Sequence, residues 1–399
     1  MKKELLRRFL LAGLLLGAVL ALYQYSQVEK PALVNMEGQV FTPADVTEGL
    51  RDNQQENGSR IGDQLVRVEL TAGRQRGQQV EANCPNGMLF GAVCVPGQQI
   101  ILLSSNMGPM GVHTVYSLDR TLAIAAFVGG FLALLCLVGG AKGLRSAMAL
   151  LFTFTSFLLL FFPMLLHGHS PIFAAVVTSL LILAATVYLI NGWSLKALAA
   201  GTAAFGGVLA AGLTAVGFGW LAGLSGYNVS NIESLMFIQQ NTGIDVGQLL
   251  FAGILFASLG AVLDIAMDVA AAADELRRHN PALGARRLFA SGMHIGRDVM
   301  GTMATTLILA FFGGSLGIWV LDYVYALPYL QLVNSNAVGI EVMQGLSGSV
   351  GVILTVPLAA ALSAWLPEGA ARVMNWSVTN RNRVQMYLCR KLNTKNLAK

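Results

Sequence analysis

Long apolar runs separated by short polar turns make up the chain from residue 121 onward. Each run has close to the ~20 residues that an α-helix needs to cross the hydrocarbon core of a bilayer. We expect transmembrane helices near 121–140, 144–166, 171–190, 197–220, 247–270, 298–321 and 345–366. Together with one further apolar run near the N-terminus, this pattern predicts an all-α polytopic membrane protein with about eight transmembrane helices.

The N-terminal run, Phe9–Tyr23, follows a short basic segment, which is the arrangement of a secretory targeting signal. The aromatic residues Tyr23 and Tyr25 at its end suit a membrane interface better than a cleavage site. We therefore expect residues 1–25 to remain as an uncleaved signal-anchor helix, with a removed signal peptide as the alternative.

Segment 26–118 shows a different pattern, in which apolar and polar positions alternate. Gln64–Leu70 alternates as a half-buried strand does, and so do the stretches Val93–Val95 and Ile100–Leu103. Glycines between these stretches predict turns. The segment is therefore expected to fold as a small β-rich, OB-like domain, in which Asp52–Gly62 forms a loop.

Basic residues lie on one set of turns between the apolar runs. The opposite loops, 167–170, 221–246 and 322–344, contain neither Lys nor Arg. The basic positions are Lys142, Arg145, Lys196, Arg277, Arg278, Arg286, Arg287 and the tail 372–399. The positive-inside rule then predicts a cell (inner) membrane protein with both termini cytoplasmic. The expected domains are an anchor, 1–25; an extracytoplasmic β-rich domain, 26–118; a seven-helix transmembrane domain, 119–371; and a basic cytoplasmic tail, 372–399.

Composition agrees with a membrane protein and excludes several functions. The chain is 55% hydrophobic and 12% charged, whereas a soluble domain carries about 25% charged residues. The net charge of +5 does not indicate nucleic-acid binding, because the basic residues lie at topological positions and no basic groove appears. Walker, HExxH and nucleophile-elbow motifs are missing from the sequence, so we expect neither an ATP-driven pump nor an enzyme, and no cofactor.

Two cysteines, Cys84 and Cys94, fall in the predicted extracytoplasmic domain. They bracket a turn, and outside the cytoplasm a disulfide is the usual state of such a pair. We predict a Cys84–Cys94 bridge; two free thiols or a metal pair are the alternatives. His167 and His169 have no third metal ligand nearby, so we predict a solvated loop there and no metal site.

The first apolar runs after residue 121 carry their charges only on predicted turns. Ala203, Gly207 and Ala211 repeat at a spacing of four, which gives a helix face of small residues. Close helix packing explains this face fully.

Two later apolar segments carry polar residues. Asp264 and Asp268 lie at i and i+4 and therefore project from one helix face. The next segment supplies His294, Arg297, Asp298 and Thr302. A carboxylate inside a bilayer costs at least ~2.5 kcal/mol and is usually paired or faces a wet cavity. The natural charge partner is Arg297, and His294 could accept a proton near neutral pH.

Simple helix-end anchoring is the alternative explanation for these residues. Asp264 and Asp268 would then lie near the cytoplasmic interface, and Asp298 near a helix start would gain from the helix dipole. On the functional explanation, Asp264 and Asp298 lie at similar depth and face each other across one helix–helix interface.

Residues 259–266 and 291–304 resemble the YibE/F family of bacterial membrane proteins, and Thr305-Thr306 departs from the family's pattern. The resemblance implies a multi-pass membrane protein of permease type with an external β-rich domain, and it supplies no substrate.

We expect a permease that moves a small solute or ion, with Asp264, Asp268 and Asp298 in its path. The main alternative is a membrane scaffold or regulator whose β domain binds a partner. The expected partners are membrane lipids and the solute or ion, and a homo-oligomer or an extracytoplasmic protein partner stays open.

Overall fold

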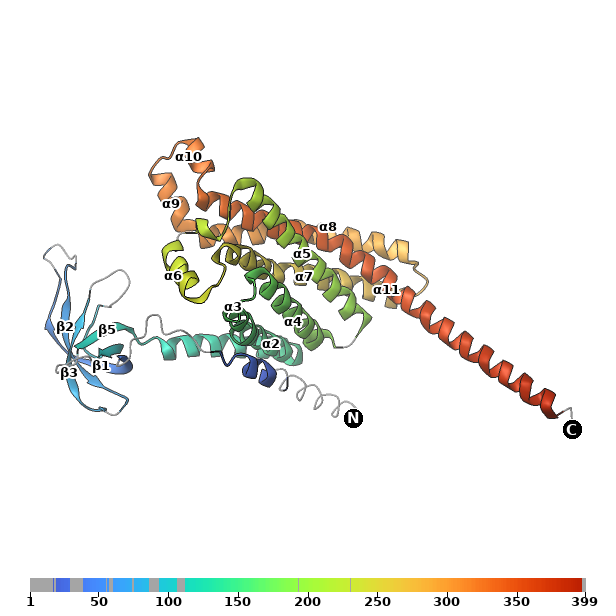
Figure 1. Cartoon of the computed structure of the whole chain (residues 1–399), viewed down its shortest axis with the longest axis horizontal. Helices are drawn as coiled ribbons and strands as arrows, with labels where there is room; N and C mark the ends of the chain where they lie inside the picture. Colours follow the sequence, from blue (N-terminus) through green and yellow to red (C-terminus); the bar gives the residue numbers. More distant parts are fainter. Residues whose placement is uncertain are drawn as a thin grey trace. The chain divides into compact units, whose positions relative to one another are not determined.

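The computed structural model describes residues 17, 19–28, 39–54, 56, 60–73, 75–85, 93–105, 112–192, 194–229 and 231–396, with side chains up to residue 366. The chain divides into two compact units, Pro31–Val138 and Met1–Lys30 with Gly139–Lys399. The first contains a small β-barrel, and the second is helical (Figure 1). Most of the expected anchor helix lies outside the described residues, although 19–25 are helical.

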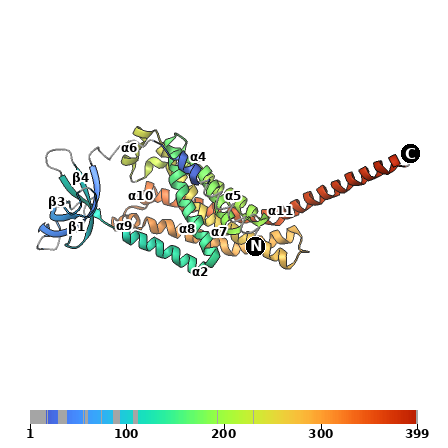
Figure 2. The same cartoon turned by 90° about the horizontal axis from the view of Figure 1, so that it is seen from below.

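Five strands form the barrel (Figure 2), and they pair in the closed order β1-β2-β3-β5-β4. They are β1 (Gln39–Arg51), β2 (Gln64–Leu70), β3 (Gln79–Cys84), β4 (Gln99–Ser105) and β5 (Val112–Leu118). Neighbours pair antiparallel except β3 and β5, which are parallel. Alternate side chains, including Val66, Val68, Ile100 and Leu102, point into one apolar core, so the strand expected at Gln64–Leu70 is confirmed.

The strand expected at Val93–Val95 is wrong, and β4 begins only at Gln99. A side chain takes the place of a neighbouring strand there. Gln64 Nε2 donates to the carbonyl of Cys94 over 2.8 Å, and the amide of Cys94 donates to Gln64 Oε1 over 3.0 Å. Because both backbone groups of Cys94 are satisfied in this way, the residue needs no strand partner.

Six helices of the described chain are long and apolar enough to cross a membrane. They are α2 (Thr121–Ser156), continued by η1 (Phe157–Phe161) and α3 (Phe162–Leu166); α4 (Pro171–Asn191); α5 (Leu195–Ala222); α7 (Leu249–His279), preceded by η3 (Val246–Gln248); α8 (Ala285–Gly314); and α11 (Asn336–Asn396). The break expected between 140 and 144 is present: α2 consists of two helices that meet in a kink at Gly140, whose φ of 53° and ψ of −132° are non-helical. Such a backbone conformation is open to glycine because it lacks a Cβ.

The helix expected at 298–321 is wrong in its bounds. α8 runs from Ala285 to Gly314, so it begins 13 residues earlier than expected (285 against 298). The basic residues in its first four turns lower the hydropathy there. The buried stripe Ala285, Leu288, Gly292 and Gly296, at a spacing of three or four, is what marks this part as a packed helix. Likewise α11 begins at Asn336, nine residues before the expected 345.

Four short helices, η2 (Gly226–Asn228), α6 (Ile232–Thr242), α9 (Leu316–Val324) and α10 (Tyr329–Val333), connect the long ones. α6, α9 and α10 gather at one end of the helical unit (Figure 1). Leu224, Ile340 and Met343 pack in one cluster at this end, which joins the loop after α5 to the start of α11.

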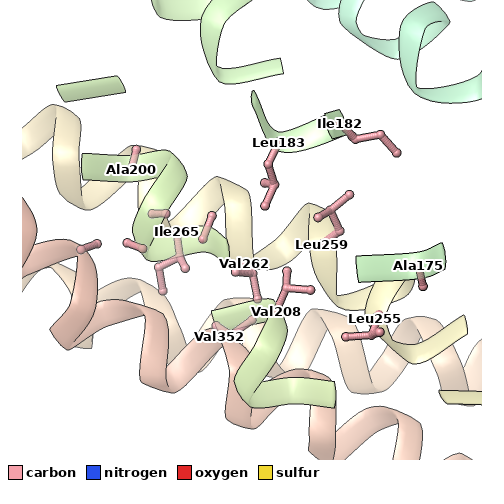
Figure 3. Packing of buried hydrophobic residues seen from close by; sticks show 14 of the residues in the cluster. Ala175, Ile182, Leu183, Ala200, Val208, Leu255, Leu259, Val262, Ile265 and Val352 are labelled. Carbon is pink, nitrogen blue, oxygen red and sulfur yellow. The ribbon is translucent and has the colours of Figure 1, made fainter. Parts of the chain in front are cut away.

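The core of the helical unit lies where α4, α5, α7 and α11 meet. Val208 of α5, Val262 of α7 and Val352 of α11 are fully buried against one another's helices (Figure 3). The small residues Ala203 and Ala211 of α5 are 0% exposed, and a Cβ on Gly207 would lie only 3.0 Å from the carbonyl oxygen of Gly351. The packing role expected for this stripe is therefore confirmed.

Candidate functional site

One face of α7 carries both expected aspartates. The helix buries its opposite side in the core through residues such as Val262, Ala266 and Val269. The open face holds only small or acidic residues at helical spacing: Gly253, Ala257, Gly260, Asp264 and Asp268, all exposed. Sequence reasoning found the two aspartates and missed the small residues that continue their line for three further turns.

Asp264 and Asp268 also lie within the helix rather than at its end. Asp264 is the sixteenth of the 31 residues of α7 (264 counted from 249), and Asp268 is the twentieth. The charged cluster that ends the helix begins only at Asp274.

The open face of α8 carries the remaining candidates. Gly292 and Gly296 pack on α11, where added Cβ atoms would meet Ala360 and Val356. The opposite side is exposed and polar: His294, Arg297, Asp298, Gly301, Thr302 and Thr305. Asp298 is the fourteenth residue of α8 (298 counted from 285), so stabilisation by the dipole of a helix start does not explain it.

Contacts along the α7–α8 pair define how the two faces are aligned. Val269 lies beside Gly292, since a Cβ on that glycine would be 3.6 Å from Val269 Cγ1. The helices are antiparallel neighbours, so five residues back along α7 correspond to five residues forward along α8. Along the helix axes, Asp264 is therefore at the same height as Arg297. Asp268 is at the same height as His294 to within one residue.

Both polar faces are exposed, but the six candidate residues do not make a closed site within one chain. Among the described residues, no ion pair joins Arg297 to a carboxylate. The pairing of Asp264 with Asp298 across one interface stays a prediction. Thr302 donates to the carbonyl of Val299 over 2.8 Å, which leaves the lone pairs of its hydroxyl oxygen on the open face.

A family model described as YibE/F-like protein matches residues 127–369. The match contains most of α2 and all of α4, α5, α7 and α8, and thus both polar faces. This chain belongs to the YibE/F-like family. No curated protein and no solved structure matches the chain. The family expected from residues 259–266 and 291–304 is therefore confirmed.

Outside the match, the barrel of this YibE/F-like chain brings its two cysteines together. The Sγ atoms of Cys84 and Cys94 are buried and 3.2 Å apart. The hydrogen bond between the two thiols, together with burial, raises the pKa of Cys94 far above its usual value. The disulfide stays a prediction, and its partners are already adjacent.

The expected loop histidines contact parts of the helical unit rather than each other. The ring of His167 stacks on Tyr25, with centroids 4.7 Å apart, and its Nδ1 lies 2.8 Å from the carbonyl of Pro163. Within the described ranges, no three His, Cys, Asp or Glu side chains gather as metal ligands do.

Sequence reasoning missed one further carboxylate. Glu341, near the start of α11, accepts a hydrogen bond from the hydroxyl of Ser315, and its other oxygen, Oε2, is buried without a partner in the described chain. It lines a small cleft of about 180 Å³ with Trp319 and Phe312. The signal available in the sequence was a single acidic residue, Glu341, at the start of a long apolar run.

Proposed function

We propose that this YibE/F-like chain is a subunit of a permease for a proton or a small cation, and that α7 and α8 line its path. The observation that carries the proposal is the pair of polar faces on α7 and α8 described above. Three carboxylates, an imidazole and several hydroxyls are exposed along two long apolar helices.

Helix geometry supports a position of these carboxylates near the bilayer centre. Ten residues separate Asp264 from Asp274, where the charged end of α7 begins, and this corresponds to about 15 Å at 1.5 Å per residue. Eleven residues separate Arg287 from Asp298 in α8, or about 16 Å. Each distance is half of a hydrocarbon core about 30 Å thick. Charged groups at that depth usually mark ion or proton routes.

Lipid is a poor cover for this face. Leaving three carboxylates against acyl chains would cost on the order of 7 kcal/mol, which is comparable to the whole stability of a typical protein. A second copy of the chain suits the face better. α7 presents Asp264 and Asp268, whereas α8 presents Arg297 beside Asp298 and the imidazole of His294, so the α8 face of a second copy offers a guanidinium to the acidic α7 face. The glycines of the α7 face allow a partner helix to approach closely.

Carboxylates and hydroxyl oxygens are suitable ligands for a proton or a hard cation. Asp264 and Asp268 are one helical turn apart, and like charges at that spacing favour a proton or a cation between them. Thr302 adds a neutral oxygen about one helical turn beyond Asp298 on α8. Asp268 and His294 lie toward the basic end of α7 and α8, so they form the next step along a proton or cation route.

A scaffold or regulatory role is the second candidate, and the barrel favours it. The strand order β1-β2-β3-β5-β4 supports an OB-type barrel, a fold that often binds ligands on its strands. Phe41 and Tyr116 are 47% and 42% exposed and pack edge to face, with ring centroids 5.2 Å apart. An exposed aromatic pair is a common centre of protein interfaces. On this view the barrel recruits an extracytoplasmic partner and the helices anchor it.

Ion flux into vesicles tests the permease. Purified full-length protein is reconstituted, and proton, sodium and potassium flux are measured for wild type, Asp264→Asn and Asp298→Asn. Asp274→Asn is the matched control, because Asp274 is an aspartate of the same helix that already pairs with Arg278 over 2.9 Å. We expect flux in wild type and in the control, and at least a tenfold loss in the two other variants. Wild-type vesicles no more permeable than empty ones for every ion tested would remove the proposal.

Cross-linking tests the second copy separately. A cysteine at Ala257, on the α7 face, should form inter-chain disulfides in membranes, whereas a cysteine at Leu213, on an exposed part of α5, should not. Equal yields at the two positions would argue against α7 as the interface between copies.

A further inference from the structure

A pocket of about 470 Å³, lined by charged as well as apolar residues, lies where α4 ends and α5 begins, with α7 and α11 supplying its other walls. It lies at the basic end of the helical unit and is separate from the α7–α8 face. None of the candidate residues described above lines it.

The charged side chains of the pocket are mainly basic. Lys196 projects from the first turn of α5, and Arg277 and Arg278 project from the last turns of α7. Asp274 is the acidic lining residue, and it already pairs with Arg278 over 2.9 Å. The pocket therefore holds an excess of two positive charges.

Arg277 is fixed in place by α11. Its Nη2 donates to the carbonyls of Ser363 and Ala364 over 3.3 and 2.8 Å. In an α-helix the carbonyl of Ser363 would accept from residue 367, but that residue is Pro367, which has no N–H. Arg277 supplies the missing donor with one nitrogen, and its other N–H groups remain for a ligand.

The N-terminus of α5 adds backbone donors to the pocket. The first N–H groups of a helix have no acceptor within the helix, and they attract anions together with the helix dipole. Ser194 Oγ accepts from the amide of Ala197 over 3.0 Å. The amides of Leu195 and Lys196, both of which line the pocket, are left for a ligand.

A buried hydroxyl also lies in the wall of the pocket. Ser363 lines the pocket and is only 8% exposed, and its Oγ has no hydrogen-bond partner among the described residues. Buried polar side chains in folded proteins are nearly always hydrogen-bonded.

We propose that this pocket binds a phosphate group, either of an anionic lipid headgroup or of a soluble phosphate. A phosphate oxygen is an acceptor for ammonium, guanidinium, hydroxyl and amide donors alike, and its charge matches the excess of the pocket. In a membrane, the same set of basic residues would lie at the level of lipid phosphates on the side that the positive-inside rule assigns to the cytoplasm. The proposal does not depend on the permease.

Binding measurements on the full-length protein in a neutral detergent test this site. Three probes are titrated: dioleoyl phosphatidylglycerol, dioleoyl phosphatidylcholine and inorganic phosphate. The variants are Lys196→Gln, its conservative counterpart Lys196→Arg, and the control Lys142→Gln, which removes an exposed lysine outside the pocket. If Lys196→Gln fails to fold, Arg278→Gln, at an arginine whose side chain is 71% exposed, replaces it.

We expect phosphatidylglycerol to bind more tightly than phosphatidylcholine, and Lys196→Gln to weaken that binding about fivefold, the effect of one lysine near an anionic surface. Lys196→Arg and Lys142→Gln should bind like wild type. The same pattern with inorganic phosphate alone would support the site and identify a soluble ligand as its source. Equal binding of both anionic probes by wild type, Lys196→Gln and Lys142→Gln would overturn the proposal.

Discussion

Gly207 of α5 is the position at which the helical core should be least tolerant of a single added carbon. A Cβ there would overlap Thr355 Oγ1 and would lie 2.8 Å from Val262 Cγ1 and 3.0 Å from the carbonyl oxygen of Gly351. Two of these neighbours belong to α11 and one to α7. Gly207→Ala therefore has to push three helices apart at their common crossing point.

The cost of this substitution follows from two effects. Overpacking a well-packed core costs about 1–3 kcal/mol. If Thr355 rotates to make room, its hydroxyl also loses the 2.7 Å hydrogen bond that it donates to the carbonyl of Gly351, and a buried unsatisfied group costs about 1–3 kcal/mol. We expect Gly207→Ala to lower the free energy of unfolding by about 3 kcal/mol.

Thermal unfolding of the purified protein, followed by tryptophan fluorescence, measures the effect. Gly217→Ala is the matched control, because Gly217 lies on an exposed part of the same helix with nothing within 4 Å of its Cβ position; it should leave stability unchanged or raise it by up to about 1 kcal/mol. Adding Thr355→Ala to Gly207→Ala should restore part of the loss. Equal melting temperatures for Gly207→Ala and Gly217→Ala would refute the close helix crossing.

Three further predictions concern the barrel and the end of α7. Mass spectrometry without reductant should find Cys84 joined to Cys94, and reduction of this bridge, which closes a short loop, should cost the barrel about 3 kcal/mol; two alkylated thiols in protein from an oxidising compartment would contradict it. Hydrogen bonds from the amide of Asn53 and from Arg60 lower the pKa of the Asp52 carboxyl. The stability that these bonds give the folded protein is complete above the ordinary pKa of 3.8 and is lost as the pH falls through the lower pKa of the folded state. Asp52→Asn should therefore flatten the acid limb of a melting-temperature profile, and an unchanged profile would count against the pairing. Arg277→Met should destabilise the protein by about 2 kcal/mol and by clearly less in a Pro367→Ala background; a double-mutant cycle with no coupling would show that Arg277 does not replace the missing donor.

Periodicity in the sequence predicted the elements whose burial is simple. β2 alternates because one face is inside the barrel, and the long helices follow from apolar runs of bilayer length. Prediction failed where a distant residue decides the local structure. Val93–Val95 alternates like a strand, yet the Gln64 side chain satisfies the backbone of Cys94. The first turns of α8 carry four basic residues, and only the contacts of its glycines with α11 show why they are helical.

The candidate site could likewise be predicted from the sequence only in part. The i, i+4 spacing of Asp264 and Asp268 places them on one face whatever the fold, so the sequence alone predicts that much. Whether this face is enclosed depends on which helices α7 packs against, and no spacing contains that information. The phosphate pocket was beyond prediction, because Lys196, Arg277 and Ser363 come from three helices far apart in the chain.

Open glycines on the α7 and α8 faces raise the question of what covers them. Glycine weakens a helix by about 1 kcal/mol relative to alanine, yet Gly260 and Gly301 face open space within one chain. This alone is not decisive, because Gly129 of α2 is open as well.

The side chains beside these glycines distinguish α7 and α8 from α2. On α2 they are large and apolar, with Phe127 82% and Phe131 51% exposed, and acyl chains can cover such a surface. On α7 and α8 the neighbours of the open glycines are carboxylates and hydroxyls, which need hydrogen-bonding or cationic partners in a medium without water. Whatever covers these faces in a membrane must therefore supply polar groups. The second copy proposed above, which carries His294 and Arg297, would meet this requirement in a membrane, whereas acyl chains would not.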